Sequence, residues 1–482
     1  MTNGTTSPVA SAAIKTGRAV NGPWIVARRF VAGLHATMFA LYVGAILVGT
    51  PRPGLGPGNI IQGPDSTGYV YAATHRFLDA GVARAAPLFP TLLRIAFTNI
   101  RITVVLQSLL ACAAWHWLAG SGAAFARSEG IKLAIFASVL CLSLVPEVMI
   151  WNVAIGSEGL SIATMIAAIA SAASALHHGT ARRWLVAAMM VVLSIAARDT
   201  NAVLAGSAVL LGIAVIIRSL RTRRASGDGE TARTHLRVAT IVIVLCTTSV
   251  ALSTKYASLA NPPRWLQPLQ ENVVNRIVPN DAFTRWFEAR GLPQAAQLRK
   301  YSGENYFLGY THIQDDPEFL SFRTWLRKDG QATYLQFVAT HPAWALHAFV
   351  TDRDFVWLPE TAIYTGIANA RPGRAYGFIG ALVFWRSSEV LIAWSVGVCV
   401  LLAWRRRWND TDGWLRLGLF GALATGVLHA FIAYTGDHLE VGRHAITANV
   451  QVRVSLWICT WLLIDRARTR RKRFRHRRHQ RH

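Results

Sequence analysis

Charged residues are scarce in this chain, and acidic residues are the scarcer kind. Only 16% of the 482 residues are charged, whereas 52% are hydrophobic and the mean hydropathy is +0.30. This composition excludes an ordinary soluble globule and favours a polytopic membrane protein. Residues 1–25 are polar and contain no apolar core, so we expect no removable signal peptide.

Cysteine is also rare, and the common catalytic motifs are missing. The five cysteines all fall inside apolar segments and show no CxxC spacing: Cys112, Cys141, Cys246, Cys399 and Cys459. This placement argues against a disulfide framework and against a thiol metal site, and it favours a packing role between helices. The sequence contains no P-loop, HExxH or GxSxG motif and no cysteine-based catalytic site.

The shortage of acidic residues leaves a net charge of +25. Much of the excess lies in short basic runs beside apolar segments, a pattern that orients membrane proteins, and no run belongs to a nucleic-acid module. We therefore expect no nucleic-acid partner. The basic tail 466–482 is expected to bind anionic membrane lipids, at about 1 kcal/mol for each cation near the surface.

Apolar runs long enough to cross a bilayer recur along the chain. We predict ten spans, at about 29–49, 102–120, 131–151, 158–176, 183–198, 200–218, 237–256, 388–404, 414–434 and 446–465. The predicted fold class is therefore an all-α polytopic membrane protein with about ten transmembrane helices.

The short loops alternate in Lys and Arg content without a violation, which predicts that both termini are cytoplasmic. The predicted organisation is a cytoplasmic tail (1–28), a transmembrane catalytic module (29–256) with an external loop (50–101), an external domain (257–387), C-terminal transmembrane helices (388–465) and a basic cytoplasmic tail (466–482). We expect amphipathic helices in the external loop and a small, mostly helical external domain.

Four polar islands between apolar runs fall on the external side and hold the candidate site residues. In the first, Asp65 precedes an amphipathic stretch, 66–82, that we expect to form a helix along the membrane surface. The Asp65 carboxylate either caps this helix or faces a membrane cavity as a base or metal ligand. In the second, Glu158 opens an apolar span, where it either complements the helix dipole or belongs to a functional site.

The third island joins two spans without a spacer and contains Arg198 and Asp199, which either pair with each other or belong to a site. Asp199 is also a candidate cap of the helix that follows.

The fourth island precedes the last span and contains Arg443 and His444, where the helix dipole disfavours a cation. A nearby anion would compensate, either Asp437 or Glu440, or a bound phosphate. Lys255 supplies another cation on the same side.

The order of these islands resembles the GT-C superfamily of integral membrane glycosyltransferases, and within it bacterial relatives of the protein O-mannosyltransferases and the lipid A aminoarabinose transferases. The resemblance rests on GPDSTGYV at 63–70, FLDAG at 77–81, APLFPTLL at 86–93, SEGLS at 157–161, ARD at 197–199, the Arg443-His444 pair and the run from Trp325 to Pro342. It covers the first six spans best, and the external domain is less diagnostic.

The resemblance implies a polyprenyl-phosphate sugar as donor, with Asp65 as general base on an acceptor hydroxyl in an inverting single displacement. The residues expected to hold the donor phosphate are Arg198, Arg443 and Lys255, and those expected to orient the acceptor or a metal are Glu158, His444 and Asp199. Many relatives carry two acidic residues in the first loop, whereas Ser66 follows Asp65 here. A divalent cation such as Mg²⁺ or Mn²⁺ would therefore need Glu158 or another carboxylate to join Asp65.

The expected function is transfer of a sugar from a lipid-linked donor to a glycan, lipid or protein acceptor at the outer face of a bacterial inner membrane. Two alternatives stay open. One is a polysaccharide ligase, which takes a lipid-linked donor but relies on Arg and His without a carboxylate base. The other is a transporter or flippase of lipid-linked sugars.

Overall fold

The computed structural model describes residues 23–49, 60–62, 66–76, 79, 81–226, 229–303, 312–358, 373–404, 410–438 and 441–479. Asp65 and Glu440 lie outside these residues, as do Phe77 and Ala80 of the predicted surface helix. Among the described residues the long elements are all helices, and the strands are a single pair of two residues each. The predicted all-α membrane fold is confirmed.

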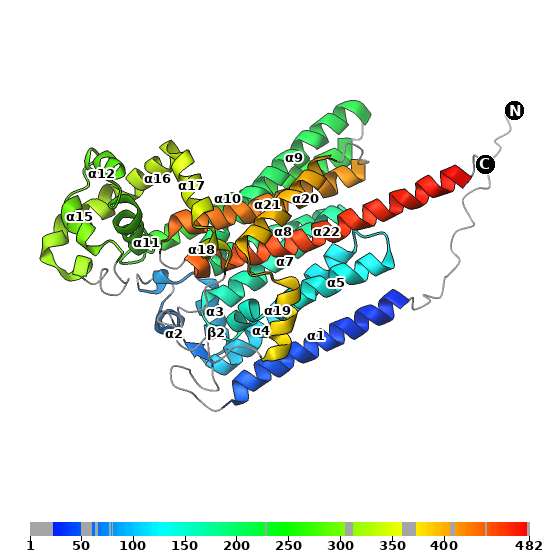
Figure 1. The fold of residues 1–482 in the computed structure, drawn as a ribbon, viewed down its shortest axis with the longest axis horizontal. Helices are drawn as coiled ribbons and strands as arrows, with labels where there is room; N and C mark the ends of the chain where they lie inside the picture. The colour runs from blue at the N-terminus through cyan, green and yellow to red at the C-terminus, as the bar shows by residue number, and fades with distance from the viewer. Residues whose placement is uncertain are drawn as a thin grey trace.

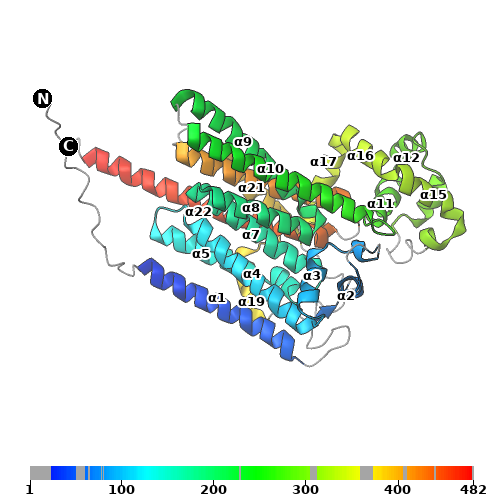
Figure 2. The ribbon, with the colours of Figure 1, turned by 180° about the vertical axis from the view of Figure 1, so that it is seen from behind.

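The long helices run roughly side by side along the molecule (Figures 1 and 2). They are α1 (Pro23–Val48), α4 (Ile100–Ala123), α5 (Glu129–Ser143), α7 (Ser157–His178), α8 (Ala181–Ala197), α9 (Ala202–Ser226), α10 (Gly229–Ser258), α20 (Ser388–Trp404), α21 (Asp410–Gly436) and α22 (Val441–His479). Every predicted span overlaps one of them. An apolar segment in lipid must satisfy its backbone hydrogen bonds internally, and a helix does so.

Among the described residues, the number of helices that qualify as full spans is slightly below the predicted ten. In the described part of the chain, seven helices are long and apolar enough to cross a membrane, or up to nine if each of two bent pairs is one span. One pair joins α5 to Pro146–Val153 at 58°, and the other joins α19 (Arg374–Val383) to α20 at 43°. The one remaining predicted span corresponds to α8. Its 17 residues rise about 26 Å, which is less than the thickness of a hydrocarbon core, roughly 30 Å.

The first bend has a local cause. Pro146 lacks the backbone N–H that a continuing helix needs, so α5 ends and the chain restarts as α6 (Pro146–Met149) and η3 (Ile150–Asn152). This break leads directly to β2 (Ala154–Ile155) and then to α7.

The two ends of the bundle differ. The beginning of α1 and the end of α22 lie at one end, and α2, α3 and the helices from α11 to α16 lie at the other (Figure 1).

The first loop is anchored on the segment before α7. Its elements are β1 (Ile61–Gln62), α2 (Ser66–Thr74), η2 (Val82–Arg84) and α3 (Leu88–Ile95). Strand β1 pairs with β2 in parallel, with Ile61 opposite Ala154 and Gln62 opposite Ile155. The prediction of one helix over 66–82 is wrong, because Arg94 of α3 donates hydrogen bonds to the carbonyls of Ala72 and Ala73, which α2 leaves unsatisfied at its end.

The segment predicted as the external domain, which keeps this name below, has a hydrophobic core of its own. Its elements are α11 (Leu266–Asn272), η5 (Val273–Ile277), α12 (Asp281–Glu288), α13 (Ala295–Leu298), η6 (Arg299–Tyr301), η7 (Pro317–Phe319), α15 (Leu320–Trp325), η8 (Leu326–Gly330), α16 (Gln331–Thr340), α17 (Pro342–Thr351) and α18 (Arg353–Trp357). Phe287, Phe322 and Phe337 are fully buried in this core, whereas Val356 and Trp357 pack into the core of the bundle. The last helices of the domain therefore fasten it to the bundle.

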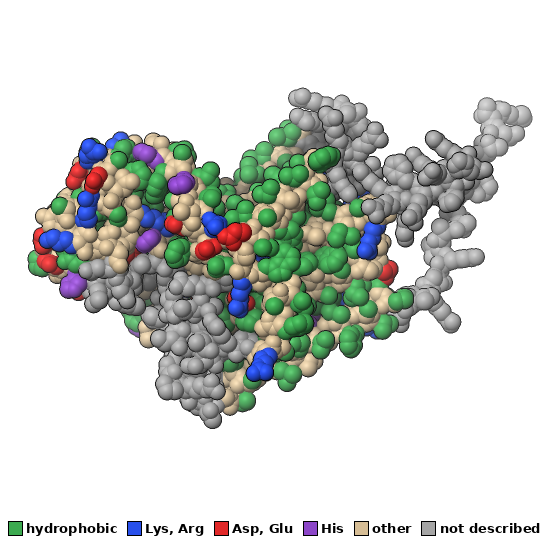
Figure 3. All heavy atoms as spheres, in the orientation of Figure 1, with side chains coloured by type: hydrophobic (Ala, Val, Ile, Leu, Met, Phe, Trp, Pro, Cys, Tyr) green, Lys and Arg blue, Asp and Glu red, His purple; other side chains and the backbone are tan. Residues whose placement is uncertain are grey.

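The surface agrees with a membrane location for the bundle. On the face in Figure 3, charged and histidine side chains gather at the end formed by the external domain, and the bundle beside it is mainly apolar. Large apolar side chains of the bundle helices are exposed, among them Leu109, Leu210, Val396 and Phe420. Such a band is expected where a protein faces lipid instead of water.

Candidate active site

The beginning of α7 is the centre of the candidate site, and glycines let its neighbours approach closely. A Cβ on Gly159 would lie 2.3 Å from the Trp151 carbonyl oxygen and 2.6 Å from Nε2 of Gln107. Gln107 donates to that same carbonyl at 2.8 Å. A Cβ on Gly156 would lie 2.6 Å from Oε2 of Glu158. Position 159 thus excludes a side chain, and the first turn of α7 is pressed against α4 and η3, whereas a side chain at position 156 would displace the Glu158 carboxylate.

Glu158 is buried between two arginines that come from distant parts of the chain. Arg198 Nη1 lies 3.1 Å from Oε1 of Glu158, and Arg443 Nε lies 3.0 Å from the same oxygen. The side chain of Glu158 is 3% exposed, and those of the two arginines are 9% and 10% exposed. One carboxylate is therefore shared by two guanidinium groups, and the triad carries a net positive charge.

The backbone explains why both arginines reach this point. Helix α8 ends at Ala197, and Arg198 is extended, with φ −160°, before the turn η4 (Asp199–Asn201). Arg443 lies in the first turn of α22. The α7 dipole favours the Glu158 carboxylate in its first turn, and Glu158 in turn compensates Arg443 at a helix N-terminus that disfavours a cation.

Hydroxyl and amide side chains connect the same elements around the triad. Tyr69 of α2 donates to Ser157 Oγ at 3.1 Å, and Ser66 donates to the Ile155 carbonyl at 2.8 Å. On the other side of α7, Asn201 donates to Ser161 Oγ at 2.9 Å, and Ser161 contacts the Thr447 hydroxyl at 3.2 Å.

All four predicted islands therefore meet at the beginning of α7. The first, third and fourth islands each contribute at least one side chain that pairs with Ser157, Glu158 or Ser161 of the second. The pairing of Arg198 with Asp199, one of the two readings of the third island, is wrong, because Arg198 pairs with Glu158.

Asp199 and Lys255, two other predicted site residues, do not contact the Glu158 triad in the described part of the chain. Asp199 accepts from Arg264 at 2.6 Å and from the Ser253 hydroxyl at 2.7 Å, which ties η4 to the end of α10. Lys255 is exposed on α10, and its ammonium has no hydrogen-bond or ion-pair partner among the described residues. The structure joins neither residue to the Glu158 triad.

A second polar group lies beside the triad, and His444 connects the two. His444 Nδ1 lies 3.1 Å from Oδ2 of Asp437, which is 8% exposed at its side chain. Burial, and then the neighbouring Asp437 carboxylate, raise the pKa of Glu271 in α11 to about 7. Asn275 donates to Glu271 at 2.9 Å. Three ionisable groups from α11, the 437–438 turn and α22 thus meet under the external domain.

Arg276 fastens the external domain to the same turn. It donates from Nε to His438 Nδ1 at 3.1 Å and from Nη1 to the Tyr434 carbonyl at 2.6 Å, and it lies over the Tyr434 ring at 4.0 Å. Burial, followed by the Arg276 charge, lowers the pKa of His438 to about 4. His438 is therefore neutral near pH 7 and can accept this hydrogen bond.

Sequence reasoning missed Tyr69, Gln107, Glu271 and Arg276. Tyr69 stands in a stretch that was already noted, four residues after Asp65, and only its partner was unknown. Gln107 is a polar residue within an apolar span, which is a signal that could have singled it out. Glu271 and Arg276 lie in a domain whose charges nearly cancel, so nothing in the sequence distinguished them.

Glu158 does not fit the role of a divalent metal ligand. Two guanidinium groups lie within 3.1 Å of its Oε1, and they would repel a cation at that oxygen. Asp65, the other metal candidate, lies outside the described residues. The chain on both sides of it is held at β2, through the pairing of Gln62 with Ile155 and the hydrogen bond from Ser66.

Comparison with known proteins gives limited similarity. No family model and no curated protein match the chain. Two solved structures of an oligosaccharyltransferase from Archaeoglobus fulgidus resemble it: AglB in complex with an inhibitory peptide and a dolichol-phosphate, at TM-score 0.43 and 9% identity, and the apo form, at 0.41 and 10%. Each alignment covers 89% of this chain and 50% of the other. The chain thus spans about half the length of these proteins, and a likeness at this level transfers no function.

Proposed function

We propose that this chain is a membrane glycosyltransferase that moves a sugar from a polyprenyl-phosphate donor to an acceptor hydroxyl, at the end of the bundle that carries the external domain. The observation that supports it most is the Glu158 triad. Two buried guanidinium groups share one carboxylate oxygen, so the group retains positive charge beside an apolar bundle. A phosphate on an apolar chain is the complementary ligand.

The charge balance gives the arginines their role in this proposal. A guanidinium has five N–H donors in a planar fork, and this geometry suits a phosphate. In the proposed reaction Arg198 and Arg443 bind the donor phosphate, and they stabilise the negative charge that grows on it as the sugar leaves. Glu158 is a positioning residue, because it holds both side chains in place without touching the sugar.

Asp65 is the general base of the proposed reaction. It takes the proton of the acceptor hydroxyl while the oxygen attacks the anomeric carbon, and the bond from that carbon to the phosphate oxygen breaks with inversion. The products are the glycoside and the polyprenyl phosphate. Support comes from the anchoring of Gln62 and Ser66 on β2, because β2 leads within three residues to Glu158.

The remaining candidates have secondary roles in the proposal. His444, held by Asp437, orients the acceptor beside Arg443. Lys255 attracts the anionic donor from its exposed position on α10, and Asp199 fixes the turn that carries Arg198. The proposed location is a bacterial inner membrane, with the site on the outer face. No step is assigned to a metal, because Glu158 does not suit one.

The test is a transfer assay on membranes that contain the full chain. A panel of polyprenyl-phosphate sugars is supplied, and released polyprenyl phosphate and new glycoside are both measured. We expect Asp65→Asn to lower transfer about 10²- to 10⁴-fold, the usual contribution of a general base. Arg443→Ala should lower it about 10²- to 10³-fold, because the leaving phosphate loses a donor. Asp281→Asn, at an exposed aspartate of the external domain, is the matched control.

The outcomes separate the three candidate functions. Full transfer by Asp65→Asn would refute the base assignment, and full transfer together with an inactive Arg443→Ala would favour a ligase. Movement of labelled lipid across vesicles without any glycosidic bond would identify a transporter.

A further inference from the structure

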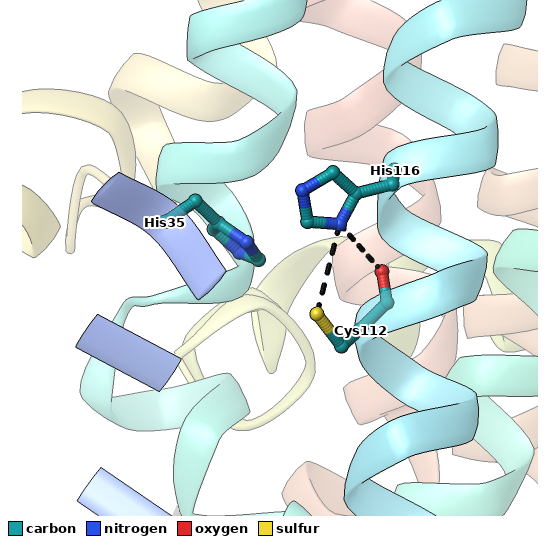
Figure 4. A group of neighbouring side chains, drawn as sticks. All are labelled: His35, Cys112 and His116. Carbon is teal, nitrogen blue, oxygen red and sulfur yellow. Dashed lines mark hydrogen bonds between the residues drawn. The ribbon is translucent and has the colours of Figure 1, made fainter. Parts of the chain in front are cut away.

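A group of side chains in the membrane, remote in sequence from the Glu158 triad, has the composition of a metal site. His35 of α1 faces Cys112 and His116 of α4 across the contact between the two helices (Figure 4). One potential ligand atom from each residue lies within 4.8 Å of the others. The planes of the His35 and His116 imidazole rings make an angle of 76°, and the ring centroids lie 4.7 Å apart.

The hydrogen bonds of His35 leave one ring nitrogen ready to bind a cation. Its Nε2 lies 2.6 Å from the Ser143 hydroxyl, and that hydroxyl donates its own hydrogen to the Leu140 carbonyl at 2.7 Å. Ser143 must therefore accept from Nε2–H, which leaves a lone pair on Nδ1. This Nδ1 is buried and has no hydrogen-bond partner among the described residues, although His35 is only 3% exposed. A buried acceptor without a donor costs free energy, and a bound cation would satisfy it.

His116 is arranged in the same way. Its Nδ1 lies 2.9 Å from the Cys112 carbonyl, which can only accept, so Nδ1 carries the proton and Nε2 keeps a lone pair. Histidines that bind metals usually donate the other ring N–H to a carbonyl or a similar acceptor, which fixes the tautomer. The Cys112 thiol lies 3.6 Å from His116 Nδ1, and its sulfur is the third potential metal ligand.

We propose that His35, Cys112 and His116 form an intramembrane binding site for a monovalent copper ion. Soft thiolate and imidazole ligands select copper or zinc, and a trigonal set of two His and one Cys is typical of copper. On binding, the Cys112 thiol releases its proton to solvent and the thiolate bonds to the metal.

Charge favours the monovalent ion over Zn²⁺. One thiolate and Cu⁺ sum to zero, whereas Zn²⁺ would leave one positive charge in an apolar setting that includes Phe39 and Phe136. Zinc also prefers four ligands in a structural site. Metal bonds of about 2.0–2.3 Å bring ligand atoms to within about 4 Å of one another, which is close to the spacing that the three residues already have.

This site modifies the expectation that no cysteine takes part in metal binding. That expectation rested on the lack of CxxC spacing, but Cys112 and His116 are four residues apart on one face of a helix. The third ligand comes from a different helix, and the sequence does not indicate which helix packs there.

The test is a titration of the purified full chain with Cu⁺ under reducing conditions, in competition with a coloured Cu⁺ chelator. We expect one Cu⁺ per chain, with one sulfur and two nitrogen ligands by X-ray absorption spectroscopy. Cys112→Ser should weaken binding at least 100-fold, and Ser143→Ala about 10- to 100-fold through loss of the bond that orients His35. Cys141→Ser, at a half-buried cysteine of α5 outside the group, should bind as the unmodified chain does.

Failure has clear signs. Binding equal in the unmodified chain and in Cys112→Ser would overturn the site, and so would equal loss in Cys141→Ser. One equivalent of Zn²⁺ that prevents Cu⁺ binding would overturn the choice of metal. If Cys112→Ser is not monodisperse in size-exclusion chromatography, His116→Gln takes its place. Transfer activity in the Cys112 variant does not enter this test, so the two proposals stand or fall separately.

Discussion

Replacement of Glu158 by glutamine tests whether the triad is held by charge. The amide has almost the same shape as the carboxylate, so packing at the beginning of α7 is retained. What changes is the charge at the oxygen that lies 3.1 Å from Arg198 Nη1 and 3.0 Å from Arg443 Nε. Two buried guanidinium groups are then left without their shared counterion.

The expected loss of stability is large. Removal of one partner from a buried ion pair costs about 3–5 kcal/mol, because an uncompensated charge stays in a medium of low polarity. Solvent gives little relief, since the side chains of Arg198 and Arg443 are only 9% and 10% exposed. The double variant Glu158→Gln/Arg198→Gln removes one of the two repelling charges, so it should regain about 1–3 kcal/mol of the loss.

The assay is unfolding of the full chain in mixed micelles. It compares the unmodified chain, the single variants Glu158→Gln and Arg198→Gln, the double variant, and Glu288→Gln as an exposed control. The control should change stability by less than about 0.5 kcal/mol. If Glu158→Gln also stays within 0.5 kcal/mol of the unmodified chain, or if the double variant loses the sum of its single losses, the charge-based account of the triad is refuted.

Two further predictions concern packing and pH. Gly159→Ala should destabilise the chain by about 1–3 kcal/mol, because the added Cβ meets the Trp151 carbonyl. The control Gly206→Ala, which has open space around it, should be neutral or stabilising, and equal effects of the two substitutions in thermal unfolding would contradict this prediction. The folded-state pKa of Glu271 is raised from 4.5 to about 7. The contribution of its protonated form to the free energy of unfolding is therefore full below about pH 4.5 and is lost as pH rises through 7. The total loss is on the order of 3 kcal/mol. Glu271→Gln should flatten stability between pH 5 and pH 8, and an unchanged slope would show that this carboxyl is not the titrating group.

Some features of the site were predictable because they depend on residues close in sequence. An apolar run forces a helix wherever it lies, since lipid offers no hydrogen bonds, and the breaks at Pro146 and Arg198 stand where proline and charged residues interrupt such runs. The polar islands could be located for the same reason, because an ionisable residue near the hydrocarbon boundary is costly unless it has a partner.

The identity of each partner was not predictable. Arg198 has a carboxylate beside it at Asp199, and simple proximity in sequence favours that pair, yet the extended backbone at Arg198 directs its side chain to Glu158 instead. The length of the helix after Ser66 was overestimated for a similar reason. Arg94, which lies 21 and 22 residues after Ala73 and Ala72, donates to their carbonyls at the end of that helix.

The sequence by itself determined that this protein is a bundle of membrane helices interrupted by polar islands, because hydrophobicity and helix length are local properties of the chain. Only the tertiary structure decided that Glu158 is shared by Arg198 and Arg443, and that His35 faces Cys112 and His116. Those contacts depend on which helices lie next to each other and at what height. Packing over the whole bundle sets both, and no stretch of sequence encodes them alone.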